Sequence, residues 1–170
     1  MSEPRDHADN RNWLETVLKK IPGFKGYLEK ENRRESDALQ REWLADRLQR
    51  SKKGIDTVTR TLVDAGQIDV LPQFDRLRAQ SDKLIGRIRG AMQGYSGIFD
   101  LVRVDEAVLD KVYEHDVMMM DRIEALARGI ESLPASVADK PAEAVNSLLQ
   151  QLDEAEQIWN KRENILKGLE

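Results

Sequence analysis

The sequence predicts an all-α protein: an antiparallel, up-down-up-down four-helix bundle with a short extra helix at its N-terminus. Apolar residues recur at alternating steps of three and four over four long stretches of the 170-residue chain. Segments that contain glycine and proline separate these stretches. Charged residues make up 34% of the chain and aromatic residues 5%, a composition typical of long helices that pack together. A chain of this length can bury a core without a disulfide or a metal.

We expect the bundle to span residues 27–170 and to be preceded by a separate segment, residues 1–26. Residues 1–11 are polar and show no periodicity, which predicts a disordered arm. A short amphipathic helix should follow, with the apolar residues Trp13, Leu14, Val17, Leu18 and Ile21 on one face. This helix is expected to fold back onto the bundle. The alternative is contact of residues 13–21 with a membrane surface.

One long helix is predicted from residue 28 to about residue 65, and its two halves differ. The second half carries a regular apolar seam that Ser51 interrupts. The first half is almost wholly charged, with opposite charges at helical spacing such as Asp37 and Arg41. We therefore expect this half to be solvated or to project from the bundle. Gly54 is a candidate break, because glycine costs a helix interior about 1 kcal/mol relative to alanine.

The second long helix should lie between Gly66 and Gly90, with Pro72 in its first turn. It is the most basic helix of the chain. We expect its cations to pair with the acidic helices that follow. The alternative is a phosphate-binding face, but no aromatic residues are interleaved with the basic ones for base stacking.

Two further helices are predicted, over residues 105–133 and from residue 141 to near the C-terminus. Three polar residues occupy positions where the apolar seams require a core residue: Ser81, Asp116 and Arg162. In an antiparallel bundle with short connections these three residues fall at one height. The sequence thus predicts a polar layer inside the bundle, in which Arg162 donates hydrogen bonds to the Asp116 carboxylate.

The polar layer has two interpretations. In the first, a buried ion pair fixes the register of the helices. In the second, buried titratable groups mark a pocket for a small ligand or a metal. A di-iron site of the ferritin type requires histidines on two separate helices, whereas this chain has only His7, in the predicted arm, and His115. We therefore predict no metal site, no cofactor and no catalytic residues.

The composition also limits the location and the partners of the protein. There is no cysteine, so disulfides and thiolate catalysis are excluded and a reducing cytoplasm is compatible. We see no secretory signal and no run of about 20 apolar residues, and we expect a cytoplasmic protein without a transmembrane segment. Residues 1–99 hold 19 Lys and Arg against 15 Asp and Glu, whereas residues 100–170 hold 8 against 16. We expect the basic half to pack against the acidic half, and the overall isoelectric point near 5.4 argues against nucleic-acid binding.

Three segments carry a resemblance to a known family: residues 21–27 (Ile-Pro-Gly-Phe-Lys-Gly-Tyr), residues 31–37, and residues 94–100 (Gly-Tyr-Ser-Gly-Ile-Phe-Asp). They resemble a family of small bacterial all-helical proteins that has no assigned activity, which implies a bacterial, intracellular setting. The predicted topology brings both glycine-tyrosine segments to one end of the bundle. An aromatic and arginine-rich surface for a protein partner is predicted there, made of Tyr27, Arg33, Arg34, Tyr95 and Phe99.

The sequence therefore predicts a non-enzymatic interaction or scaffolding module whose partner is an unknown protein or a second copy of the chain. One alternative is a bundle that binds a small ligand or a metal in its polar layer. A further alternative is a protein that binds anionic surfaces through the basic helix, residues 76–89.

Overall fold

The computed structural model describes residues 4–27, 29–91, 106–133 and 139–166, and within these ranges it contains helices and no strand. The all-α prediction is confirmed for this part of the chain. In chain order the elements are α1 (Pro4–Lys20), the 3-10 helix η1 (Lys30–Asn32), α2 (Arg33–Ser51), α3 (Lys53–Asp64), the 3-10 helix η2 (Ile68–Val70), α4 (Leu71–Gly90), α6 (Glu106–Glu131) and α8 (Pro141–Leu166).

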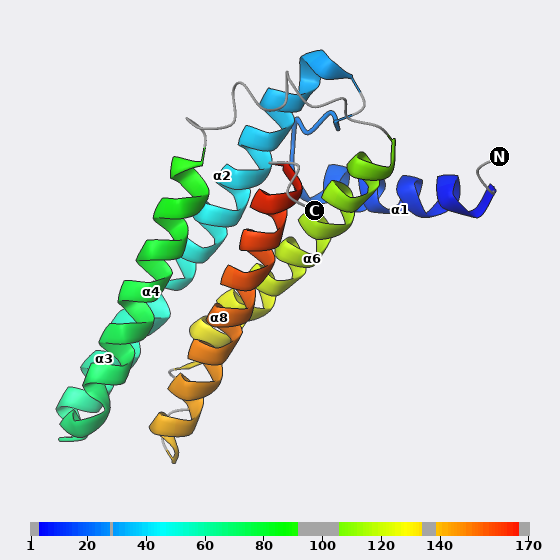
Figure 1. Cartoon of the computed structure of the whole chain (residues 1–170). Helices are drawn as coiled ribbons and strands as arrows, with labels where there is room; N and C mark the ends of the chain where they lie inside the picture. The colour runs from blue at the N-terminus through cyan, green and yellow to red at the C-terminus, as the bar shows by residue number, and fades with distance from the viewer. Residues whose placement is uncertain (1–3, 28, 92–105, 134–138, 167–170) are drawn as a thin grey trace.

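The long helices pack around one core. Helix α6 packs against α8, α2 and α1, while α4 packs against α2 and α8. Helix α3 follows α2 and contacts α4 and α6. Figure 1 shows α2, α4, α6 and α8 side by side, with the N-terminal end of α1 pointing away from them. None of the described helices combines the length and the apolar character that a membrane crossing requires.

The apolar seam predicted for the central helix is the inner face of α6. Its members are all buried, the last of them just beyond the end of α6: Leu109, Val112, Met119, Ile123, Leu126, Ile130 and Leu133. A second stripe on α6 is buried as well: Tyr113, Val117, Met120 and Ala127. Met118 belongs to neither stripe; it points outward and is 43% exposed. Because α6 packs against α1, α2, α3 and α8, it is the central element of the fold.

The long helix predicted over residues 28–65 is divided into η1, α2 and α3. The break lies at Lys52, not at Gly54. In the last turn of α2 the Ser51 hydroxyl donates to the Leu48 carbonyl oxygen at 2.7 Å, so this buried hydroxyl has a partner within its own helix. Gly54 has a different role. A Cβ built there would lie 2.3 Å from the Ile130 carbonyl oxygen, so glycine lets α3 approach the backbone of α6.

The N-terminal arm is also corrected, because α1 begins at Pro4 rather than near residue 12. Proline suits the first turn of a helix, where its missing N–H would have no partner in the helix. The C-terminal part of α1 folds back onto α6, as predicted, with Val17 and Ile21 buried. Lys20 reinforces this contact with an ion pair to Asp121 at 2.9 Å.

Charged side chains connect neighbouring helices at the surface. Arg47 of α2 donates four hydrogen bonds of 2.7–3.2 Å to Glu124 and Glu131 of α6. On the basic helix α4, Arg87 pairs with Glu163 of α8 at 3.4 Å, as the charge asymmetry predicted. Arg89 instead pairs with Asp46 of α2 at 2.6 Å. These cations of α4 therefore serve contacts between helices.

Candidate functional site

The structure brings Asp116 of α6 and Arg162 of α8 together in the core. Arg162 Nε donates to Asp116 Oδ1 at 2.6 Å. The two residues are 0% and 1% exposed, which makes this a fully buried ion pair. Arg162 also lies over the ring of Trp159, with its guanidinium carbon 5.5 Å from the ring centroid. The two charged residues that interrupt the apolar seams of α6 and α8 thus pair with each other.

Helix α2 contributes a second buried ion pair to the same cluster. Arg162 Nη2 donates to Asp37 Oδ1 at 2.7 Å, and Arg41 Nη2 lies 2.7 Å from Asp37 Oδ2. Asp37 and Arg41 are 3% and 4% exposed. The prediction that the first half of this helix is solvated or projects from the bundle is therefore wrong for Asp37 and Arg41, which are buried. The two residues do pair at helical spacing, but they face the core because their charges complete the Arg162 network.

Tyr27, in the segment between α1 and α2, closes the cluster. Its hydroxyl donates to Asp116 Oδ2 at 2.5 Å and lies 3.5 Å from Arg162 Nη2. Its backbone N–H donates to the Tyr113 hydroxyl at 2.5 Å. We call Tyr27, Asp37, Arg41, Asp116 and Arg162 the polar cluster. It joins α2, α6, α8 and the segment before α2, whose positions in the chain are far apart.

A glycine makes the approach of this segment possible. Gly26 has a φ of +91°, which L side chains rarely adopt. A Cβ at this position would lie 2.8 Å from the Tyr113 hydroxyl oxygen. Phe24 packs edge-on against Tyr27, with ring centroids 5.4 Å apart, and both are buried. The glycine-tyrosine motif at residues 26–27 therefore anchors the segment in the core.

Burial and charge act in opposite directions on the ionisable groups of the polar cluster. Burial raises the pKa of the Asp116 carboxyl, while Arg162 and Tyr27 oppose that shift. Burial alone would lower the pKa of Arg162, but Asp116 and Asp37 outweigh it and hold that pKa well above its usual value. Burial, followed by the charge of Asp116, raises the pKa of Tyr27 well above 10. At neutral pH, Tyr27 is therefore a neutral donor beside a permanent cation.

Ser81, the third predicted member of the polar layer, is buried but is not joined to the cluster by any hydrogen bond described. Its hydroxyl donates to the Leu77 carbonyl oxygen within α4 at 2.8 Å. A serine in a helix can satisfy its hydroxyl in this way without a partner on another helix. The prediction of a three-residue layer is therefore wrong for Ser81.

The predicted interaction surface at the bundle end is only partly a surface. Tyr27 is 0% exposed, because its ring lies in the core and its hydroxyl donates to Asp116 there. Arg33 is half-buried, and its Nε donates to the Tyr27 carbonyl oxygen at 2.7 Å. Arg34 is exposed. Tyr95 and Phe99 lie outside the described residues.

The apolar periodicity of the sequence indicates that Asp37 and Arg41 face the core. When the apolar seam through Leu44 and Leu48 is continued toward the N-terminus at steps of three and four, it meets Arg41 and then Asp37. The same reasoning identified Asp116 on the central helix. For Tyr27 there was no such periodic signal, because it lies outside any helix.

The geometry of the polar cluster favours structure over catalysis. All five residues are at most 4% exposed, and each ionised group is paired within the cluster. A catalytic acid or base must reach its substrate, which these groups do not. No group of three or more metal-binding side chains occurs in the described ranges. Four of the buried side-chain atoms without a hydrogen-bond partner belong to the polar cluster or to Gln40 beside Arg41 in sequence: both amide atoms of Gln40 and the Nη1 atoms of Arg41 and Arg162.

Comparison of the chain with protein-family models, with curated proteins and with solved structures gives no match. The resemblance of residues 21–27 and 94–100 to a bacterial helical family therefore stays a prediction.

Proposed function

We propose that this chain is a non-enzymatic interaction or scaffolding module, a rigid helical body that presents its outer surfaces to a protein partner. One observation supports this proposal above the others: the charged groups of the polar cluster are buried and paired with one another. A buried network of this kind contributes little net stability, but it disfavours helix arrangements that would separate its members. Fixed helix positions are what a scaffold requires.

The architecture that we infer is an antiparallel four-helix bundle. Helices α2 and α3 would form the first member, α4, α6 and α8 the other three, and α1 the extra helix. The packing of α4 against α2 and α8, and of α6 against α2 and α8, supports this arrangement. A partner would then read the bundle end near Arg34 or the outer helix faces, since Tyr27 is buried.

Affinity purification of the tagged chain from its native host tests this proposal. We compare the wild type with Arg34→Glu at the bundle end and with Arg60→Glu, a matched exposed site on α3. The proposal predicts a specific protein that wild type and Arg60→Glu retain and that Arg34→Glu loses, with all three helical by circular dichroism. The absence of any protein enriched over a tag-only control would contradict an interaction module.

A second candidate function is suggested by the unpartnered atoms of Gln40, Arg41 and Arg162. Three of these four atoms are donors, and a small acceptor-rich ligand bound in the polar cluster would satisfy them. Native mass spectrometry of the protein purified from its host distinguishes this candidate. A bound small-molecule mass that Gln40→Leu abolishes supports it, while the bare chain mass of 19.5 kDa argues for the scaffold.

A further inference from the structure

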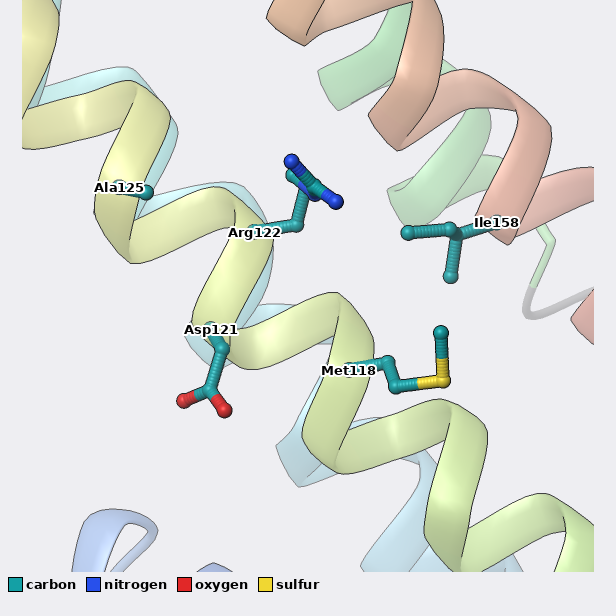
Figure 2. A pocket seen from close by; sticks show the side chains of 5 residues that line it. All are labelled: Met118, Asp121, Arg122, Ala125 and Ile158. Atoms are coloured by element: carbon teal, nitrogen blue, oxygen red, sulfur yellow. The ribbon is translucent and has the colours of Figure 1, made fainter.

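We propose that the outer face of α6 is a self-association surface, on which a second copy of this chain docks with its own α6 antiparallel to the first. A hollow of about 310 Å³ lies on this face, lined by Met118, Asp121, Arg122 and Ala125 of α6 and by Ile158 of α8. Figure 2 shows the side chains of Met118 and Ile158 pointing toward each other across the hollow. Met118 is among the few large apolar side chains that are strongly exposed.

The occupant is inferred from the symmetry of the residues on this face. The exposed stripe of α6 reads Glu114, Met118, Asp121, Ala125 and Arg128, at steps of four and three. Its two halves are complementary about Asp121. Glu114 and Arg128 lie seven residues on either side of Asp121, and Met118 and Ala125 lie three and four residues on either side.

An antiparallel pair of α6 helices therefore places unlike groups opposite each other on both sides of its centre, whereas the two Asp121 carboxylates meet near the twofold axis, each with Lys20 of its own chain as counter-ion. Glu114 would face the second copy's Arg128, so that opposite charges meet at both ends of the contact. Met118 would face the second copy's Ala125, whose small side chain leaves room for a long one. Such an interface is isologous, and each contact is made twice. A shallow crossing angle of about 20° keeps the outer charges within reach.

The charges on this face have partners within the chain but remain accessible. Asp121 pairs with Lys20 and its side chain is 65% exposed. Arg128 pairs with Glu124 on its own helix and is 75% exposed. Exposed pairs of this kind contribute little stability, so their rearrangement on association costs little. The inference goes beyond the scaffolding proposal, because it commits to one helix face and to a second copy of the chain as the partner.

Cysteine cross-linking tests the register of the pair, since the chain has no cysteine of its own. With Asp121→Cys the two thiols lie beside the twofold axis, and we expect a rapid intermolecular disulfide under mild oxidation. With Glu114→Cys the two thiols lie about 20 Å apart along the helices, too far for a disulfide. A mixture of Glu114→Cys and Arg128→Cys chains should instead form the mixed disulfide. Equal rates in all these samples would overturn the proposed register.

Sedimentation equilibrium tests the association itself. The wild type should show a mass approaching twice 19.5 kDa as its concentration rises. Met118→Glu should weaken association about tenfold or more. Val63→Glu, at a 54% exposed apolar residue on α3, is the matched control and should leave association unchanged. A wild type that stays monomeric up to about 0.1 mM, or equal effects of the two variants, would overturn the proposal.

A charge exchange separates specific docking from general stickiness. Glu114→Arg alone and Arg128→Glu alone each place like charges opposite each other, so both should weaken association. The double variant restores opposite charges at both ends and should regain wild-type association. Failure of the double variant to exceed the single variants would rule out the antiparallel pairing.

Discussion

Tyr27 donates its hydroxyl hydrogen to Asp116 over 2.5 Å, although 89 residues separate the two in sequence. The bond connects the segment between α1 and α2 to the middle of α6. Because Asp116 also accepts from Arg162 and Arg162 also donates to Asp37, this segment is tied to three helices through one carboxylate. Four parts of the chain therefore share one buried polar network.

Tyr27→Phe should lower the free energy of unfolding by about 1–3 kcal/mol. The change keeps the ring but leaves a buried carboxylate oxygen without its donor. Urea denaturation measures the loss. Thr57→Val, which removes a hydroxyl bonded to its own helix on the exposed side of α3, is the control and should change stability by less than about 0.5 kcal/mol. A Tyr27→Phe loss as small as the control's would contradict a buried bond.

Alkaline pH should destabilise the protein through Tyr27. Its pKa is raised well above 10 in the folded state. At pH values between 10 and that raised pKa, Tyr27 has lost its proton in the unfolded chain but keeps it in the folded chain. This contribution to stability is complete below pH 10 and is lost as pH rises beyond it. Above about pH 10 the wild type should lose roughly 1.4 kcal/mol more per pH unit than Tyr27→Phe. Identical slopes in urea titrations at several pH values would show that Tyr27 ionises normally.

The Asp116 and Arg162 pair was predictable from the sequence because each residue interrupts an otherwise apolar seam. The same periodicity predicted the buried faces of α4, α6 and α8. Ser81 was predicted wrongly, since a helix can satisfy a serine hydroxyl with its own carbonyl. Tyr27 was predicted to be a surface residue, because nothing in a turn sequence says which side chain points inward.

The break in the second predicted helix shows a further limit of periodicity. Gly54 is the weak point predicted from helix propensity, whereas the helix is interrupted at Lys52. What glycine provides at this position is space against the backbone of Ile130. The need for such an approach depends on a contact between α3 and α6, and no local pattern encodes that contact.

Gly54→Ala should therefore destabilise the protein although alanine favours helix. The new Cβ would lie 2.3 Å from the Ile130 carbonyl oxygen, and a backbone atom cannot move aside cheaply. We expect a loss of about 1–3 kcal/mol, as for other overpacked sites. Gly86→Ala in α4 is the matched control, because a Cβ there meets nothing within 4 Å. It should gain about 0.5–1 kcal/mol, and thermal melts in which both changes stabilise would contradict the close approach.

Acid should weaken the contact between α2 and α6 that Arg47 makes. Hydrogen bonds from Arg47 lower the pKa of both Glu124 and Glu131 below 4.5. This contribution is present above pH 4.5 and is lost as pH falls through the lowered values. Arg47→Met should cost about 1–2 kcal/mol at pH 7, a figure reduced for the partial exposure of both carboxylates. The difference from wild type should shrink below pH 4.5, and a cost independent of pH would mean that Arg47 acts by packing alone.

The central claim is that Asp116 and Arg162 form a buried pair that holds the helices in register, and a double-mutant cycle in urea tests it most directly. Asp116→Leu and Arg162→Met should each cost about 3–5 kcal/mol, because each leaves the buried cluster with one uncompensated charge. Asp153→Asn, on the exposed face of α8, should change stability by no more than about 0.5 kcal/mol. The double variant should lose at least about 2 kcal/mol less than the sum of the two single losses. An Asp116→Leu variant as stable as wild type, or single losses that simply add, would contradict the claim.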